Sequence, residues 1–563
     1  MIHRFLLPAF LGLALTFSAH GQSAANVQEG AAPPGAAPAS ISDMMQEAGR
    51  HYREGDMEAA RQGYEAVLQQ DSKSIAAYAG LARAYLKQEK LREAEEIVFK
   101  LAEFAADKPL VETARGEVYF REGKIAEAQN EFIKAANASP TEARPRLGLA
   151  RILEAMSLYR RSKSMIEKAH QLDPEDPDIY AFWLNTLGRT EKIKELQAWL
   201  ERGDRQDGTD REDVQRYLDY LKKEEAQPAH NCQLATKATS TETPLEYLLQ
   251  DPTHMRGYAL NVNINGRKAR LMLDTGASGL LVSRGIGEKA GITKVFTSKV
   301  SGIGDKGGHE TYVGYAESIK IGNLEFRDCP VEVIEKRSVL GDDGLIGADV
   351  FEHFLVDLDF PNRKLKLSEL PKRPSETAQR VRLQASGGTS GYSQDEAGSD
   401  VKKSTGNPLA RPAADEEGPK DRYIAPEMQS YARVLRFGHM LLVPTRINDV
   451  PDKLFLLDTG SLTNQISPDT AREITKVHND PDMKVRGMSG SVKKVYSADK
   501  VVLQFGRLRQ ENQDLLSYDL SRLSRGAETE ISGILGFVML HFLEVKIDYR
   551  DGLVDFKYDP NGR

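Results

Sequence analysis

Hydrophobic and small residues follow two different rhythms along this chain. Between residue 41 and about residue 203, the same kinds of residue return every 34 positions. Three series show this period: Gly55, Glu89, Gly123 and Ser157; Ala60, Ala94, Ala128 and Ser162; and Gly80, Ala114 and Gly148. Small residues at such intervals let paired helices cross closely, and Pro140 and Pro174 end helices of consecutive units. The pattern predicts roughly four helix-turn-helix units followed by a helical cap.

From Tyr258 onwards, short alternating runs replace the helical rhythm. Residues 258–264 alternate in polarity and end at Asn265-Gly266, which predicts a strand and a hairpin turn. Two polar stretches separate the helical region and the two β-rich regions from one another. Residues 204–250 are expected to be a linker with one helix near residues 212–225, and residues 369–428, rich in Ser, Gly, Pro and charge, are expected to be disordered.

The β-rich sequence contains an internal duplication. An apolar run leads into Asp-Thr-Gly twice, at residues 274–276 and at residues 458–460. Glycines then follow each aspartate at nearly equal distances, and each copy ends in an apolar-apolar-Gly strand. The matching glycines are Gly302 and Gly487, Gly322 and Gly506, and Gly347 and Gly536. So many shared offsets indicate two related lobes, each of which carries one carboxylate to a turn.

This order of motifs resembles that of the pepsin and retropepsin superfamily of aspartic peptidases. The 34-residue period resembles that of tetratricopeptide repeats. The first resemblance implies that Asp274 and Asp458 form a catalytic dyad. It also implies strands that cross beneath the catalytic turns and brace them, through Ile346, Gly347, Leu535 and Gly536. The expected fold class is multidomain α and β, with an N-terminal all-α tetratricopeptide solenoid followed by a bilobed all-β aspartic-peptidase fold.

The residues after each aspartate suit a turn that presents a carboxylate. Gly276 and Gly460 supply backbone freedom beside the aspartates. Hydroxyls of Thr275 and Thr459 can bond to the backbone of the opposite lobe, which the family resemblance describes as an interlocking pair.

One position beside the two motifs differs, since Ala277 follows the first and Ser461 follows the second. The family's geometry implies that the Ser461 hydroxyl donates to Asp458. Such a bond would favour the charged form of Asp458 and leave the shared proton on Asp274.

Glycine-rich segments at residues 300–308 and 485–490 have two interpretations. They could be phosphate-binding loops, but strand-like runs rather than helices follow them, which favours flap hairpins over a cleft. The flap candidates are Gly302, Gly304, Gly487 and Gly490. The Gly-x-Ser-x-Gly motif of serine hydrolases is absent from the sequence.

The N-terminus and composition bear on location and partners. Residues 1–21 contain a basic start, a short apolar run and a small-x-small site, which predicts a secretory signal and a periplasmic or secreted protein with no membrane span after signal removal. With 76 Lys plus Arg against 83 Asp plus Glu, nothing favours nucleic acid. Cys232 and Cys329 could form one disulfide or remain two thiols, and no metal signature is present, so no metal and no cofactor are expected.

The sequence therefore predicts an exported aspartic endopeptidase whose two Asp residues activate water, with helical repeats that bind a protein partner or substrate. The alternatives are a non-catalytic peptide-binding or assembly protein, and an adaptor in which only the repeats act. The expected segments are a signal at 1–21, a leader at 22–40, repeats at 41–203, a linker at 204–250, lobe 1 at 251–368, a linker at 369–428 and lobe 2 at 429–563.

Overall fold

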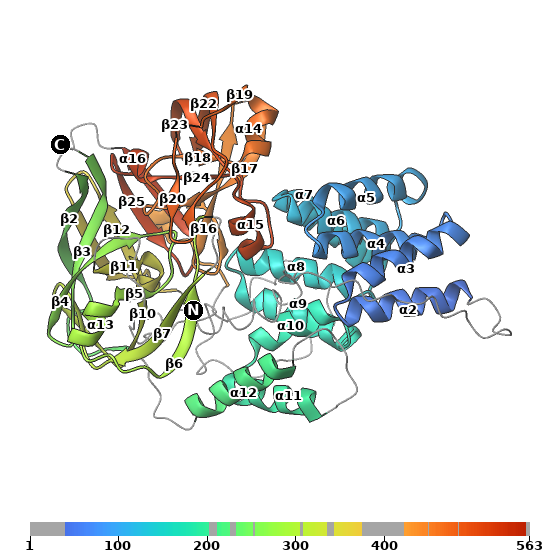
Figure 1. Ribbon diagram of the computed structural model, residues 1–563, viewed down its shortest axis with the longest axis horizontal. Helices are drawn as coiled ribbons and strands as arrows, with labels where there is room; N and C mark the ends of the chain where they lie inside the picture. The colour runs from blue at the N-terminus through green and yellow to red at the C-terminus, as the bar shows by residue number, and fades with distance from the viewer. Residues whose placement is uncertain are drawn as a thin grey trace, which may run out of the picture. The chain divides into compact units, whose positions relative to one another are not determined.

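The computed structural model describes residues 40–201, 211–225, 232–251, 254–304, 308–334, 343–373, 421–448, 450–481 and 483–558. The expected signal segment, nearly all of the leader and residues 374–420 of the second linker lie outside these ranges. The chain divides into a helical unit and a β-rich unit (Figure 1). Separate clusters of buried apolar residues lie in the two units.

The helical unit is built from antiparallel helix pairs. Its helices are α2 (Ile41–Arg53), α3 (Met57–Gln70), α4 (Ile75–Lys87), α5 (Leu91–Ala105), α6 (Pro109–Arg121), α7 (Ile125–Ala138), α8 (Arg144–Ala155), α9 (Tyr159–Leu172), α10 (Pro177–Thr186), α11 (Arg189–Glu201) and α12 (Arg211–Glu225). Small residues allow the close crossings that the sequence predicts. A β-carbon on Gly148 would lie 2.3 Å from the ring of Phe132.

Lobe 1 is a β-structure with one short helix and one 3-10 turn. Its elements are β1 (Gln233–Leu234), β2 (Thr241–Asp251), β3 (His254–Ile264), β4 (Arg267–Asp274), β5 (Leu280–Ser283), α13 (Arg284–Lys289), β6 (Phe296–Val300), β7 (His309–Ala316), β8 (Ile319–Ile321), β9 (Leu324–Arg327), β10 (Cys329–Ile334), β11 (Gly344–Gly347), η2 (Ala348–Phe351), β12 (Phe354–Asp359) and β13 (Lys364–Glu369).

Lobe 2 repeats this plan. Its elements are η4 (Pro426–Met428), β14 (Ala432–Arg433), β15 (Leu435–Phe437), β16 (Met440–Ile447), β17 (Val450–Leu457), β18 (Gln465–Ile466), α14 (Pro468–Ile474), β19 (Val477–Asn479), β20 (Arg486–Gly487), β21 (Gly490–Ser491), β22 (Tyr496–Phe505), β23 (Leu508–Ser517), α15 (Ser521–Ala527), β24 (Gly533–Leu535), α16 (Phe537–Leu540), β25 (Leu543–Asp548) and β26 (Leu553–Tyr558).

Strand order confirms the duplication. Lobe 1 runs β3-β4-β11-β5-β10-β7-β6, and lobe 2 runs β16-β17-β24-β18-β23-β22-β19 in the same sequence of roles. The lobes join within one chain because β12 pairs antiparallel with β25, in register from Val356 with Ile547 to Asp359 with Glu544. A buried ion pair between Glu352 of lobe 1 and Arg436 of lobe 2 adds a second connection.

The expected linker at residues 204–250 is corrected by the structure. Residues 211–225 form α12, close to the expected helix, and Val214 and Tyr217 pack with Trp199 in the core of the helical unit. Residues 241–251 form β2, which pairs with β3 and β13, because one face of that Thr- and Leu-containing run is buried. The polar composition concealed both elements.

Cys232 and Cys329 form a disulfide, which resolves the two possibilities that the sequence allowed. Over the described residues, no helix is long and apolar enough to cross a membrane, and no group of three or more metal-ligating side chains occurs.

Candidate active site

Each aspartate of the predicted dyad stands at the end of a buried strand. Asp274 ends β4, and Asp458 follows directly after β17. The expected bracing strands run parallel beside them, with Ile346 and Gly347 opposite Leu273 and Asp274, and Leu535 opposite Leu457. The N–H of Asp458 donates to the Leu535 carbonyl at 3.0 Å.

Both bracing glycines touch the turns that they support. A β-carbon on Gly347 would lie 2.5 Å from the Ala277 carbonyl oxygen, and one on Gly536 would lie 2.2 Å from the Thr463 carbonyl oxygen. Neither position has room for a side chain, so glycine is required by close backbone approach.

The two threonines interlock the lobes, as the family resemblance implies. Thr275 Oγ1 donates to the Leu457 carbonyl at 2.9 Å, and Thr459 Oγ1 donates to the Leu273 carbonyl at 2.9 Å. Each hydroxyl also accepts the backbone N–H of the other threonine, at 3.1 Å and 3.0 Å. Both side chains are buried. These four bonds fix the two turns against each other.

The carboxylates lie face to face across this junction. Each accepts an N–H from its own turn, since Gly276 donates to Asp274 Oδ1 at 2.9 Å and Gly460 donates to Asp458 Oδ1 at 2.8 Å. A β-carbon on Gly276 would lie 2.5 Å from Asp458 Cγ, and one on Gly460 would lie 2.4 Å from Asp274 Cγ. The glycines therefore leave the space that the opposing carboxylate occupies.

The two aspartates differ in their affinity for a proton. Removal from solvent and the neighbouring charge of Asp458 raise the pKa of Asp274 well above its ordinary value. Burial also raises the pKa of Asp458, but hydrogen bonds from Asp274 and from the N–H groups of Gly460 and Ser461 act against that rise. The electrostatics favour a proton on Asp274 and a charge on Asp458.

Ser461 supports the second turn differently from the expectation. Its backbone N–H donates to Asp458 Oδ1 at 3.1 Å, while its hydroxyl accepts from Gln465 Nε2. In lobe 1, Ser278 is likewise engaged elsewhere, because its hydroxyl donates to Asp349 Oδ2 at 2.8 Å. Backbone N–H groups of both turns lower the pKa of their own aspartate, so the difference between Asp274 and Asp458 arises from the interaction of the two carboxyl groups with each other rather than from the serine hydroxyl.

The flap candidates come together from both lobes. The N–H of Gly302 donates to Ser489 Oγ at 3.1 Å, and the N–H of Ser489 donates to the Ile303 carbonyl at 2.9 Å. Gly487 and Gly490 flank the turn of the small β20–β21 hairpin, and a β-carbon on Gly304 would lie 2.5 Å from the backbone of Ser489. The structure therefore places all four glycines at one contact between the lobes.

Sequence reasoning missed several residues that position these turns. Asp349, two residues after Gly347, caps the first turn through Ser278 and the N–H of Gly279. In lobe 2 the tie runs from the turn to the bracing strand instead, since Asn464 Oδ1 accepts the N–H of Gly536 at 2.9 Å. Asp349 and Asn464 stand at different places in their lobes, so the duplication gave no signal for either residue.

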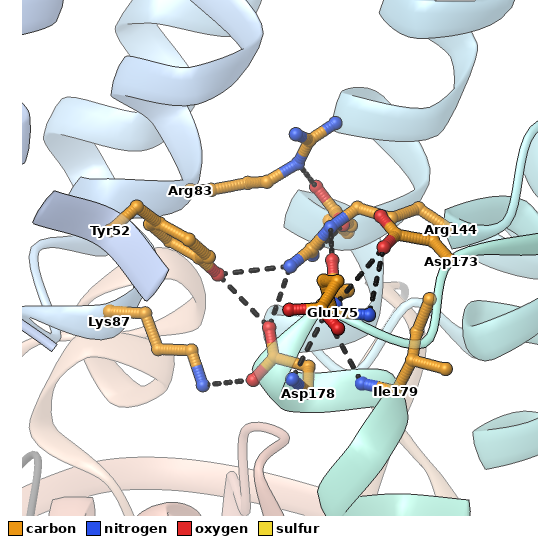
Figure 2. A network of polar contacts seen from close by, with 10 residues as sticks. Tyr52, Arg83, Lys87, Arg144, Asp173, Glu175, Asp178 and Ile179 are labelled. Carbon is orange, nitrogen blue, oxygen red and sulfur yellow. Dashed lines mark hydrogen bonds and ion pairs between the residues drawn. The ribbon is translucent and has the colours of Figure 1, made fainter. Parts of the chain in front are cut away.

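A separate polar network joins helices of the helical unit. Arg144 of α8 contacts Glu117, Asp176 and Asp178 at 2.7, 2.8 and 2.7 Å. Tyr52 of α2 and Lys87 of α4 also reach Asp178, and Arg83 joins through Glu117 (Figure 2). The first helix of each of the five pairs thus contributes to one network, centred on an arginine that is 11% exposed.

Comparisons with known proteins agree with this geometry. Residues 260–350 and 443–538 match the sequence model of the Aspartyl protease family, and residues 51–118 match that of the Tetratricopeptide repeat. The UBA domain-containing protein Mud1 of Schizosaccharomyces pombe is 31% identical over 125 residues, which cover 20% of this chain and 36% of that protein. DNA damage-inducible protein 1 of Cryptococcus neoformans is 25% identical over 190 residues, 31% of this chain and 43% of that protein.

The chain thus spans 36% and 43% of the lengths of these relatives. Among solved structures, the aspartic proteinase from Irpex lacteus aligns with 57% of this chain and 98% of its own, at 12% identity and a TM-score of 0.31. Both copies of the Asp-Thr-Gly motif therefore lie within segments that match the Aspartyl protease model, and the helical region contains a segment that matches the Tetratricopeptide repeat.

Proposed function

We propose that this protein is an exported aspartic endopeptidase that hydrolyses peptide bonds at Asp274 and Asp458. The observation that carries the proposal is the opposition of the two carboxylates across the threonine interlock. Two carboxylates in unequal protonation states can supply both a general base and a general acid to one water.

The proposed reaction requires no metal ion and no organic cofactor. Ionised Asp458 removes a proton from the lytic water as that water attacks the scissile carbonyl. Protonated Asp274 donates to the carbonyl oxygen, and a tetrahedral diol forms. Asp458 then gives its proton to the leaving nitrogen and Asp274 takes a proton from a diol hydroxyl as the C–N bond breaks, so the dyad regains its starting state.

The experiment that tests this function is digestion of denatured casein by the purified full chain, with and without pepstatin. We expect pepstatin-sensitive fragments from the wild-type protein and none from Asp274→Asn. Intact casein under conditions where the protein is folded would instead favour the non-catalytic peptide-binding or assembly protein.

Export is supported by two independent features. The N-terminal apolar run has the form of a signal peptide, and the Cys232–Cys329 disulfide suits an oxidising compartment. Fractionation of the source cells, followed by alkylation with and without reductant, tests this part. The proposal expects a periplasmic or secreted protein with both thiols blocked until reduction.

The helical repeats are proposed to bind a protein partner or the protein substrate. Because Arg144 and Lys87 are both paired with Asp178, the partner is expected to contact other positions of the repeats. Deletion of residues 41–203 should leave cleavage of short peptides intact and weaken action on a natural protein partner. Equal activity on both kinds of substrate would remove this role.

A further inference from the structure

The duplicated lobes place side chains of opposite chemistry at matching positions beside the dyad. Leu281 and Gln465 each lie seven residues after their aspartate. Strand register extends the match, because β5 pairs with β10 as β18 pairs with β23, so that Ile334 corresponds to Tyr518. Ala277 and Ser461 complete the comparison, at three residues after each aspartate. Every lobe 1 member of these pairs is apolar, and every lobe 2 member carries a polar group.

On the lobe 1 side these residues belong to an apolar cluster distinct from the main core. Leu281, Val300, Ile334 and Leu345 are buried within it, and Ala277 packs against it. Its remaining members are Leu248, Ala259 and Met272.

The Met488 side chain packs against this cluster, which indicates that the cluster can receive an apolar side chain. It comes from the turn of the lobe 2 flap and packs against the lobe 1 cluster, so it crosses from one lobe to the other. A β-carbon on Gly302 would lie 2.9 Å from Met488 Cβ, which shows how closely the flaps meet. Methionine is flexible and unbranched, so it can leave and be replaced by another apolar side chain.

On the lobe 2 side the matching residues form a buried hydrogen-bonded chain. Tyr518 OH donates to Gln465 Oε1, and Gln465 Nε2 donates to Ser461 Oγ. All three residues are at most 7% exposed. Buried polar groups that are paired in this way resist replacement by apolar contacts, because an unpaired donor or acceptor carries a desolvation cost.

Tyr518 also lines a pocket of about 190 Å³. Gly302, Ile303 and Gly304 of the flap line it together with the apolar residues Val492, Leu520 and Leu523. Asp519, Ser521, Arg522 and Arg525 bring charged and hydroxyl groups to the same pocket. The pocket is smaller than the ~300–1,000 Å³ typical of sites for whole small molecules. Its size and lining suit one polar side chain of a longer ligand.

We infer that the protein selects peptide substrates with an apolar residue on one side of the scissile bond and a hydrogen-bonding residue on the other. The inference rests on the proposed peptidase function and adds its substrate class. Lobe 1 receives the apolar side chain in place of Met488, and lobe 2 receives the polar side chain beside Tyr518. Two duplicated catalytic turns are thus coupled to an asymmetric binding site.

Mass spectrometry of casein fragments made by the full-length protein tests the inference first. The expected cleavage sites have an apolar residue at one flanking position and Gln, Asn, Ser, Thr or a charged residue at the other. Sites with apolar residues on both sides would overturn the inference while leaving the peptidase function intact. Absence of any cleavage would overturn the peptidase function and the inference together.

Four matched peptides then measure the preference. They carry Leu-Leu, Leu-Gln, Gln-Leu or Gln-Gln at the scissile bond within one flanking sequence. We expect one mixed peptide to exceed both its reversal and Leu-Leu in kcat/KM by about 10-fold or more, the scale of discrimination by single side-chain pockets. A ranking led by Leu-Leu would contradict the inference.

Exchange of lobe 2 residues for their lobe 1 counterparts gives the sharpest test. The double variant Gln465→Leu with Tyr518→Ile should raise the ratio of Leu-Leu to the favoured mixed peptide about 10-fold. Gln513→Leu makes the same type of change at an exposed position of β23 and should leave the ratio unchanged. If the double variant does not fold, Tyr518→Phe removes only the hydroxyl and should shift the ratio in the same direction. An unchanged ratio in a folded variant would overturn the assignment of Tyr518 to specificity.

Discussion

Replacing Thr459 with valine removes half of the interlock while keeping the shape of the side chain. Two hydrogen bonds disappear, one donated to the Leu273 carbonyl and one accepted from the Thr275 N–H. Both partners are in the buried junction and would lack any replacement. At ~1–3 kcal/mol for each unsatisfied buried group, the expected loss in free energy of unfolding is about 2–6 kcal/mol.

Activity should fall as well, because the interlock aims the two turns. A displacement of about 1 Å at a reacting group costs roughly 100-fold in rate, so we expect kcat to fall about 10- to 100-fold. Urea unfolding and casein turnover measure the two effects. Thr445→Val is the matched control, since this buried hydroxyl donates only to the Val443 carbonyl in its own strand. If Thr459→Val proves no more damaging than Thr445→Val in either assay, the interlock does not aim the dyad.

Three further changes probe the rest of the molecule. Arg144→Met should cost about 3–5 kcal/mol in the helical unit because it removes a cation that Glu117, Asp176 and Asp178 share, so that Glu117 keeps only its pair with Arg83 and Asp178 only its pair with Lys87. Arg61→Met breaks i,i+3 and i,i+4 pairs along one helix and should cost under about 1 kcal/mol in the same urea assay. Cys232→Ser opens a loop of 97 residues and should lower the free energy of unfolding by about 2–5 kcal/mol, a loss that reductant should reproduce in the wild-type protein but not in the variant. Burial and the neighbouring charge of Asp551 raise the pKa of Asp548 to about 7, so the folded protein binds more protons than the unfolded chain between about pH 4 and pH 7. The free energy of unfolding therefore falls as pH rises through this window, by up to about 4 kcal/mol in total, and Asp548→Asn should remove this fall. An unaltered pH dependence in the variant would contradict the assignment.

Most of the candidate active site could be predicted from the sequence because its geometry is local and duplicated. An aspartate at the end of a buried strand, followed by a threonine and a glycine, predicts the turn. The apolar-apolar-Gly strand predicts its support, and both copies agree in the structure. The helical period was equally direct, since Gly148 and Phe132 make the close crossing that small residues imply.

Contacts between distant segments were beyond prediction. The sequence did not indicate that Met488 of one lobe packs on the apolar cluster of the other, nor that Arg144 collects carboxylates from α6 and α10. The Ser461 hydroxyl was expected to reach Asp458, but Gln465 lies close enough to engage it instead. The sequence predicts a linker at β2 because Thr241 and Thr243 occupy two of its buried positions while Glu242 and Pro244 are exposed between and after them. Apart from the Ser461–Gln465 bond, which joins residues four positions apart, these outcomes depend on packing partners far away in the sequence.

The central claim is that Asp274 and Asp458 act as one catalytic pair, and the rate of casein hydrolysis by Asp458→Asn tests it most directly. The change is nearly isosteric and keeps the acceptor for the N–H groups of Gly460 and Ser461, so circular dichroism should match the wild type. Asp499→Asn, at an exposed position of β22, controls for the substitution itself. The account predicts a rate at least about 1,000-fold below that of wild type and of the control, since loss of the base removes general base catalysis and its coupled partner together. Near-normal turnover by folded Asp458→Asn would contradict it.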